Sequence, residues 1–253
     1  MSNKISRRRI ITTGLAALSS VAGLDAAAKI ADRYGLLAPD HQGIFGVGEA
    51  LTYGAQRLLT SHHSMAREFS RSEISDVSPV NHGHPDYDPY QRMLFNKFKD
   101  WRLYVDGLVA RPMSFSLADL KSLPSRTNIT QLTCEEGWSY IAAWTGVPLA
   151  LILNLVGASA KAKWIVFYPF NDFWGSIDIV EALHPQTLLA HGMNGEDLTP
   201  DHGAPIRLRI PRQLGYKNLR YIARISVTDS LKNIGDGTGS AAPEIGYSWY
   251  GGI

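Results

Sequence analysis

Alternating hydrophobic and polar positions predict several short elements in the second half of the chain. Trp101–Gly107 alternates apolar and polar residues and ends in a glycine, which is typical of a half-buried strand that leads into a turn. Ser116 is followed three residues later by Asp119, a capping-box pattern that predicts the start of a short helix. The apolar run Pro148–Val156 predicts a buried helix with proline in its first turn.

The same patterns predict further strands and a mixed architecture. These strands are Asn128–Thr133, Lys163–Tyr168, Ile206–Ile210 and Tyr221–Val227. Strands and short helices are intermixed without a repeating strand–helix–strand period, so we expect a single α+β domain over residues 96–253. Residues 29–95 contain scattered Gly, Pro and His and one helical candidate, Gly48–Leu59. We expect this loop-rich segment to wrap around the domain.

The first 28 residues have the layout of an export signal. Arg7–Arg9 precede a weakly apolar stretch, Thr12–Leu24, and small residues follow it. Ser-Arg-Arg before apolar residues resembles the twin-arginine pattern, so we expect residues 1–28 to direct export to the periplasm. An uncleaved leader that acts as a membrane anchor, and a basic N-terminus without a targeting role, are the alternatives.

Composition and charge narrow the classes of function. The chain has 253 residues, of which 45% are hydrophobic and 19% are charged, as in an ordinary globular protein. The net charge is +2, but the leader carries Lys4, Arg7, Arg8 and Arg9 against Asp25, so the remainder has a net charge of −1. This balance argues against nucleic-acid binding. The absence of Walker and GxGxxG motifs removes support for nucleotide binding.

The sequence contains a single cysteine, Cys134. This excludes an intramolecular disulfide, a four-cysteine zinc site, a CxxC pair and an iron–sulfur cluster held by several thiolates. Cys134 is therefore a buried thiol, a nucleophile or a lone metal ligand. Glu135 and Glu136 follow it directly, and their negative charge disfavours a free thiolate because it raises the thiol pKa. A bound metal cation would reverse that effect.

Ordered motifs around and beyond this cysteine resemble a known family. They read Cys134-Glu-Glu-Gly-Trp-Ser139, Trp144-Thr-Gly-Val-Pro-Leu149, Asn194-Gly195, Gly203-Ala-Pro-Ile-Arg-Leu208 and Gly215-Tyr-Lys217. In this order they resemble the molybdopterin-binding domain of the sulfite oxidase family, from about Asn81 to the C-terminus. The leader and the ending Ala242–Tyr247 are similar to the periplasmic, methionine-sulfoxide-reductase-like branch of catalytic subunits.

The resemblance implies a sulfite oxidase-like fold and a molybdenum–molybdopterin site. It makes Cys134 the catalytic residue and the one protein ligand of molybdenum, because the pterin dithiolene supplies the other sulfurs. The implied cofactor-binding residues are Asn81, His82, His84, Cys134, His202, Arg207, Lys217, Asn218, Leu219 and Arg220. Arginine suits a phosphate because its planar fork pairs bidentately. As an alternative, His82 and His84 form a small divalent-metal site, although no third ligand has a matching spacing.

The residues also bear on the substrate. Tyr168, Asn171 and Trp174 are candidates for lining a substrate pocket, although most aromatic side chains in this region are expected in the core. Val80 stands where true sulfite oxidases carry an arginine that helps to hold the anion, so sulfite would lose a charge-assisted contact here. We therefore expect two-electron oxygen-atom transfer that reduces a sulfoxide or a similar neutral oxide.

Two other functions stay open, and the resemblance suggests a partner. Sulfite-type oxidation and a non-catalytic molybdopterin- or metal-binding role in the periplasm are the alternatives. The resemblance implies a separate electron-transfer partner, which in the reductase-like branch is a membrane haem protein. We expect a monomer and no nucleic-acid partner.

Overall fold

The computed structural model describes residues 29–30, 36–40, 46–59 and 64–253. The predicted export signal at residues 1–28 lies outside these ranges, and the predicted domain boundaries stay predictions. None of the helices within these ranges is long and apolar enough to cross a membrane.

The first of the two sheets in the described residues contains one parallel pair of strands, which lie far apart in the sequence. Its strand order is β2 (Met113–Ser116), β1 (Arg102–Gly107), β10 (Ile222–Thr228), β5 (Trp164–Pro169) and β6 (Gly175–Asp178). β1 and β10 are parallel, and the other neighbours are antiparallel. The strands predicted from alternation at Trp101–Gly107, Lys163–Tyr168 and Tyr221–Val227 are therefore confirmed, within a residue or two at each end.

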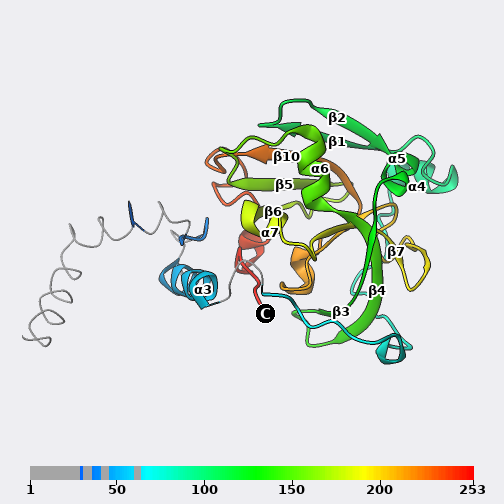
Figure 1. Ribbon diagram of the computed structural model, residues 1–253, viewed down its shortest axis with the longest axis horizontal. Helices are drawn as coiled ribbons and strands as arrows, with labels where there is room; N and C mark the ends of the chain where they lie inside the picture. Colours follow the sequence, from blue (N-terminus) through cyan, green and yellow to red (C-terminus); the bar gives the residue numbers. More distant parts are fainter. Residues whose placement is uncertain (1–28, 31–35, 41–45, 60–63) are drawn as a thin grey trace, which may run out of the picture.

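The second sheet carries the turn that contains Cys134. Its order is β3 (Arg126–Thr133), β4 (Ser139–Pro148), β7 (Leu188–Met193) and β8 (Glu196–Asp197), and β9 (Arg207–Arg209) also pairs with β7. β3 and β4 form an antiparallel hairpin that is paired from its open end to Thr133 opposite Ser139. In Figure 1 the strands of this hairpin lie at a steep angle to the strands of the first sheet.

Helices are short and connect or cover the two sheets. They are α3 (Gly46–Leu59), α4 (Asp88–Phe95), α5 (Leu117–Ser122), α6 (Leu149–Val156) and α7 (Ile179–Ala182), with 3-10 turns η1 (Arg71–Glu73), η2 (Gly215–Lys217) and η3 (Pro243–Ile245). The predicted capping box is present, because Ser116 accepts a hydrogen bond from the Asp119 backbone and the Asp119 carboxylate accepts one from the Ser116 backbone. The predicted buried helix is α6, which ends at left-handed Gly157.

A continuous hydrophobic core fills the space between the sheets. α6 contributes Leu149, Ile152 and Val156, all fully buried, to a cluster that also contains Leu103 of β1 and Trp101, which directly precedes β1. Because α6 follows β4 directly and leads to β5, it joins the two sheets through this core.

Residues 29–95 contain more helix than the sequence pattern predicts. The difference is α4, whose single buried side chain is Tyr90. The Tyr90 ring lies against Phe98, Phe170 and Tyr221, and its hydroxyl donates to the Ala204 carbonyl at 2.8 Å. One long-range aromatic anchor therefore stabilises a helix too short to be detected from its own periodicity.

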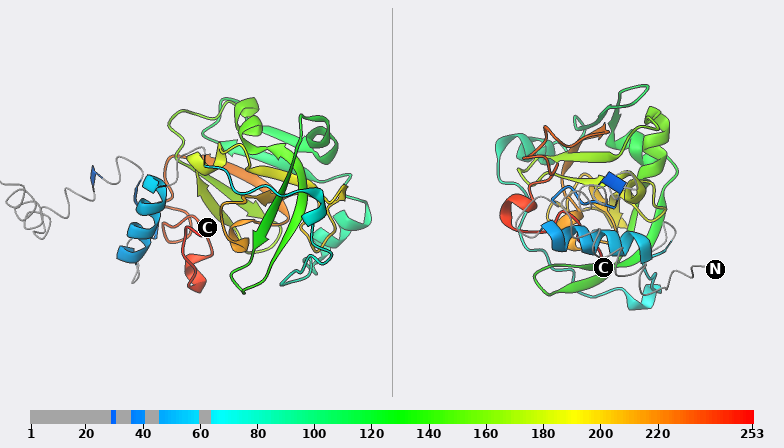
Figure 2. Two further views of the ribbon diagram at one scale, coloured as in Figure 1. Left: turned by 60° about the horizontal axis from the view of Figure 1, so that its bottom comes forward. Right: turned by 90° about the vertical axis from the view of Figure 1, so that its left-hand side faces the viewer.

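Helix α3 packs against the C-terminal segment rather than against a sheet. Figure 2 shows it beside the red end of the chain, and Tyr53 of α3 contacts Trp249 and Tyr250 edge-on. Arg57 of α3 reaches the buried carboxylates of Asp178 and Glu181. The N-terminal segment is therefore held to the domain by an aromatic cluster and by buried charges.

The free energy of unfolding is expected to depend strongly on Glu181. This fully buried carboxylate accepts from Arg212 Nη2 at 3.0 Å and lies 3.4 Å from Arg57 Nη2. Glu181→Gln should lower the free energy of unfolding by about 3 kcal/mol, because it removes the charge that compensates buried guanidinium groups. Urea denaturation measures this loss.

The control is Lys121→Gln, which breaks an exposed pair between Lys121 Nζ and Asp197 Oδ1 at 2.7 Å. This substitution should lower the free energy of unfolding by less than about 1 kcal/mol, because solvent screens exposed charges. Equal losses in the two variants would contradict the assignment of a buried charge cluster.

Candidate active site

Cys134 lies in the tight turn between β3 and β4. The Cys134 backbone N–H donates to the Trp138 carbonyl at 2.8 Å, and the Gly137 N–H donates to the Cys134 carbonyl at 3.2 Å. Gly137 has a φ of +94°, which a residue with a side chain rarely adopts. The Cys-x-x-Gly spacing thus closes a turn that presents the thiol at the end of a rigid hairpin.

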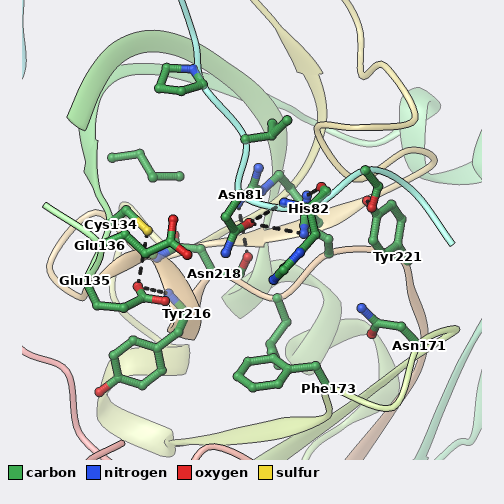
Figure 3. Close-up of a pocket in the computed structure, with 18 of the residues that line it drawn as sticks. Asn81, His82, Cys134, Glu135, Glu136, Asn171, Phe173, Tyr216, Asn218 and Tyr221 are labelled. Carbon is green, nitrogen blue, oxygen red and sulfur yellow. Dashed lines mark hydrogen bonds between the residues drawn. The ribbon is translucent and has the colours of Figure 1, made fainter. Parts of the chain in front are cut away.

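The thiol faces a cavity of about 410 Å³, within the size range of small-molecule sites. Figure 3 shows Cys134, Glu135 and Tyr216 on one side of this cavity, and Tyr221 and Asn171 on the other. The other lining residues are apolar, aromatic and polar, and they come from the upstream loop, the loop after β5, β9, the η2 segment and the C-terminal segment. They include Val80, Asn81, His82, Phe173, Arg207, Asn218, Leu219, Arg220, Ile245 and Tyr247.

The surroundings of the thiol favour its protonated form. Burial raises the pKa of Cys134 to about 11, and the Glu135 carboxylate adds to this rise. Glu135 Oε2 lies 3.5 Å from Cys134 Sγ and accepts a hydrogen bond from the Tyr216 backbone N–H at 3.2 Å. A free thiolate nucleophile is therefore disfavoured, whereas a metal cation would hold the sulfur deprotonated.

This pKa predicts slow alkylation of the cofactor-free protein. At pH 8 the folded protein should react with iodoacetamide about a hundredfold more slowly than the urea-denatured chain, because the pKa is about 11 rather than the ordinary 9.0. The rate should rise about tenfold per pH unit up to about pH 10. Mass spectrometry of quenched samples measures it, and equal rates for the folded and denatured chains would refute the buried, acid-flanked thiol.

Two cations away from the thiol have no carboxylate partner. Arg207 is buried, donates to the carbonyls of His202 and Asn218 at 3.0 and 3.1 Å, and stacks on the Trp144 ring. Arg220 donates to the carbonyls of His82 and Asp201, both at 2.8 Å. Within the described part of the chain neither guanidinium forms an ion pair. This end of the cavity is therefore suited to an anionic group.

The η2 segment brings these cations and the thiol to one cavity. A Cβ added at Gly215 would lie 3.3 Å from Cys134 Cα and 3.4 Å from the Thr133 carbonyl, so only glycine gives this close approach without a shift. Asn218 follows in the same segment, and its Oδ1 accepts from Arg209 Nη1 at 2.9 Å and from the Ile210 N–H at 2.7 Å. The buried Arg209 thus holds the turn that carries the cavity wall.

Most of the residues predicted for the site converge here. Asn81, His82, Cys134, Arg207, Asn218, Leu219, Arg220 and the substrate candidate Asn171 line the cavity. They come from the upstream loop, the β3–β4 turn, β9, the η2 segment and the loop after β5. Sequence neighbours thus supply only parts of the site, and the fold assembles them.

Three predicted cofactor-binding side chains do not line the cavity, because each has other partners. His84 Nδ1 lies 2.7 Å from Asp201 Oδ1. His202 is held by Thr199 Oγ1 at 2.8 Å and by the Ser78 carbonyl at 3.1 Å. Lys217 is buried, and its Nζ donates to the carbonyls of Ser176 and Trp249. These groups support the loop, the turn and the C-terminal segment around the cavity.

Two substrate candidates are also placed elsewhere. Tyr168 and Trp174 stack on each other, with ring centroids 6.2 Å apart, and Arg224 covers the Tyr168 ring. The pair lies beside the loop that delivers Asn171 and Phe173, but it does not line the cavity. The ring stack, and Arg224 over Tyr168, hold these side chains outside the cavity.

Sequence reasoning missed several aromatic residues of the cavity. Trp138, Phe173, Tyr216, Tyr221 and Tyr247 line it. Trp138 and Tyr216 were part of the quoted motifs, so proximity to Cys134 and Gly215 was the available signal. Tyr247 belongs to the ending Ala242–Tyr247 that resembles the reductase-like branch, but its place at the cavity depends on the packing of the C-terminal segment.

The donor set fits a phosphate-bearing cofactor with a thiolate-bound metal. Arg207 Nε and Asn171 Oδ1 are buried at the cavity and lack hydrogen-bond partners among the described residues. The unpaired cations suit a phosphate, and Cys134 offers the single thiolate. No group of three or more His, Cys, Asp or Glu side chains suited to a metal ion occurs in the described ranges, so the alternative site at His82 and His84 gains no third ligand.

Comparisons with known proteins agree with this donor set. The family model of the oxidoreductase molybdopterin binding domain matches residues 91–233. A putative protein-methionine-sulfoxide reductase subunit, YedZ1, of Azospira oryzae is 41% identical over 152 residues, which are 60% of this chain and 56% of that protein. The protein-methionine-sulfoxide reductase catalytic subunit MsrP of Xanthomonas axonopodis pv. citri is 33% identical over 186 residues, 66% of this chain and 57% of that protein. The chain thus spans somewhat more than half the length of these curated relatives.

A solved structure shows the same kind of fold. The sulfane dehydrogenase SoxCD from Paracoccus pantotrophus aligns with a TM-score of 0.50 and 24% sequence identity, over 55% of this chain and 43% of that chain. This likeness concerns the fold alone. Together with the mixed first sheet, the antiparallel second sheet and the short helices, it confirms the predicted α+β architecture.

Proposed function

Because the chain belongs to the sulfite oxidase family of oxidoreductase molybdopterin-binding domains, we propose that it catalyses two-electron oxygen-atom transfer and reduces a sulfoxide or a similar neutral oxide. The observation that carries the proposal is a lone thiol, Cys134, that faces a cavity whose cations have no carboxylate partner. The sulfoxide reductases among its relatives support the direction of the reaction.

The residues present define how the cofactor would be held. Cys134 would ligate molybdenum, and Arg207 and Arg220 would contact the phosphate end of the pterin. When bound, the molybdenum cofactor supplies the two-electron redox chemistry and the site of oxygen transfer. Backbone carbonyls of His202 and Asn218 hold the Arg207 guanidinium, and those of His82 and Asp201 hold Arg220, so the anion meets pre-oriented donors.

The protein side of the cavity favours a neutral substrate. Val80 lines the cavity and supplies no charge where sulfite oxidases carry an arginine. Glu135 and Glu136 are next to Cys134, so the reacting end is acidic as well as apolar. Sulfite, an anion, would meet repulsion there instead of a charge-assisted hydrogen bond. A sulfoxide carries no net charge and avoids this cost.

Export and electron supply complete the proposal. The leader pattern at residues 1–28 supports periplasmic export by the twin-arginine route, with an uncleaved anchor as the alternative. The relatives are named as subunits of reductases, which supports a separate electron-transfer partner. A membrane haem protein would suit an exported catalytic subunit.

Elemental analysis and one paired assay test this proposal. Purified protein should contain about one molybdenum per chain and should reduce methionine sulfoxide with a dye as electron donor. Zinc or copper without molybdenum would support a histidine metal site instead. Molybdenum without any turnover would support a non-catalytic binding protein. Sulfite oxidation far faster than sulfoxide reduction would overturn the interpretation of Val80.

A further inference from the structure

Apolar side chains from separate segments meet at the mouth of the cavity. Val80, Trp138, Phe173, Ile245 and Tyr247, here called the apolar rim, all line it. Ile245 is 64% exposed, and Val80 and Tyr247 are each 38% exposed. Large apolar groups gathered around one opening, rather than scattered singly, are typical of a binding surface.

The C-terminal part of the rim is held rigidly. η3 ends at left-handed Gly246, and the N–H groups of Ile245 and Tyr247 both donate to the Ala242 carbonyl, at 3.2 and 3.0 Å. The Tyr247 ring stacks on Tyr216, with centroids 5.0 Å apart and an angle of 17° between the planes. A preformed apolar surface loses little entropy when it binds a ligand.

This tail is tied to the reacting end of the site. The Tyr216 hydroxyl donates to the Ser248 carbonyl at 2.9 Å, and the Tyr216 backbone donates to Glu135 beside Cys134. Ser248 Oγ in turn donates to Glu49 of α3 at 2.9 Å. The rim therefore has a fixed position relative to the thiol. Ile245, Tyr247 and Val80 lie outside residues 91–233, the range that the family model matches.

We infer that the apolar rim is a subsite for the apolar neighbours of a sulfoxide in a peptide, an inference that rests on the proposed function. A substrate that places a neutral oxide near Cys134 must extend outward past the rim. The five rim side chains carry no charge that could pair with a charged flank, and Glu135 and Glu136 line the same cavity. Apolar side chains that flank the sulfoxide would instead pack on the rim, and this contact would remove both the rim and the flanking side chains from water. The rim therefore selects oxidised methionine within an apolar stretch.

Kinetics with matched substrates test the subsite. The molybdenum-loaded protein is assayed on a peptide with one methionine sulfoxide between leucine and phenylalanine, on the same peptide with serine and glycine flanks, and on dimethyl sulfoxide. Ile245→Ser and Tyr247→Ala should each lower kcat/KM for the apolar-flanked peptide about tenfold. Their values for the other two substrates should change less than about twofold. Phe95→Ser, at a 91% exposed position of α4 away from the cavity, should change none of the three.

Binding without an electron donor separates this inference from the proposed function. Tryptophan fluorescence should give a dissociation constant for the apolar-flanked peptide that rises about tenfold in Ile245→Ser. Equal losses on all three substrates, or no loss on any, would overturn the subsite. A wild-type protein that binds the apolar peptide selectively but reduces no sulfoxide would keep the subsite and refute the proposed reaction.

Discussion

Replacing Cys134 with serine is expected to lower turnover by at least about a thousandfold while the protein stays folded. The reason is chemical, because Cys134 is the only cysteine and serine offers a hard oxygen with a far higher pKa in place of a soft thiolate. The fold should tolerate the change, since serine is close in size to cysteine and the sulfur contacts only Glu135 Oε2, at 3.5 Å, and the Glu136 backbone among the described polar groups. Dye-coupled turnover, molybdenum content and the melting temperature measure the three parts of this expectation.

The matched control is Thr133→Ser, one residue earlier on β3. Thr133 pairs with Ser139 in the same hairpin, but it does not line the cavity. Thr133→Ser should keep turnover within about threefold of the wild-type value, because β3 remains paired and the thiol remains in place. Full activity in Cys134→Ser would remove Cys134 from the catalytic site.

Replacing Arg207 with methionine is expected to lower the molybdopterin content at least about tenfold. Methionine keeps much of the buried volume, but the substitution removes a guanidinium that lines the cavity and that we propose to bind the phosphate. Arg207→Lys keeps the charge without the planar fork, so its cofactor content should be intermediate. Molybdenum analysis and the fluorescence of released pterin measure this content, and the melting temperature shows whether the variants fold.

Arg209 provides the control for this prediction. Arg209 is equally buried and stacks on the same Trp144 ring, with the guanidinium carbon 5.4 Å from the ring centre, but it does not line the cavity. Arg209→Met should lower cofactor content less than about threefold, because the Arg209 guanidinium does not line the cavity and contacts Asn218, Thr130 and the Gln131 carbonyl instead. Burial lowers the pKa of Arg209 to about 9, so removing this charge also relieves a desolvation cost. Equal losses in both variants would contradict a direct role for Arg207.

The elements that the sequence predicted correctly are those whose stability signals lie within a few residues of one another. The capping box at Ser116, the glycine stop of α6 and the alternation of β1 each depend on a few neighbouring residues, and each is present. Helix α4 was not predicted, because its stability comes from Tyr90 and its distant aromatic partners. Propensity is a weak signal where tertiary packing decides.

The site shows the same division at the level of single residues. Cys134, Arg207 and Asn218 were found because they stand in ordered motifs, and they line one cavity. Lys217 stands in the same motif, yet its ammonium group contacts the carbonyls of Ser176 and Trp249 instead. Spacing along the chain does not determine the direction in which a side chain of a 3-10 turn points. Only the fold therefore shows that Asn218 lines the cavity and that Lys217 does not.

The sequence by itself determined the family, the single thiolate and the unusual valine at position 80, because residue identity and order carry these properties. The tertiary structure decided which cations lack a carboxylate partner, which histidines are held by Asp201 and Thr199, and that Ile245 and Tyr247 reach the cavity mouth. The physical reason is distance. Charge pairing, burial and close packing act over a few ångströms in space. Residues that are distant along the chain, such as Cys134 and Tyr247, come within that range only when the chain folds.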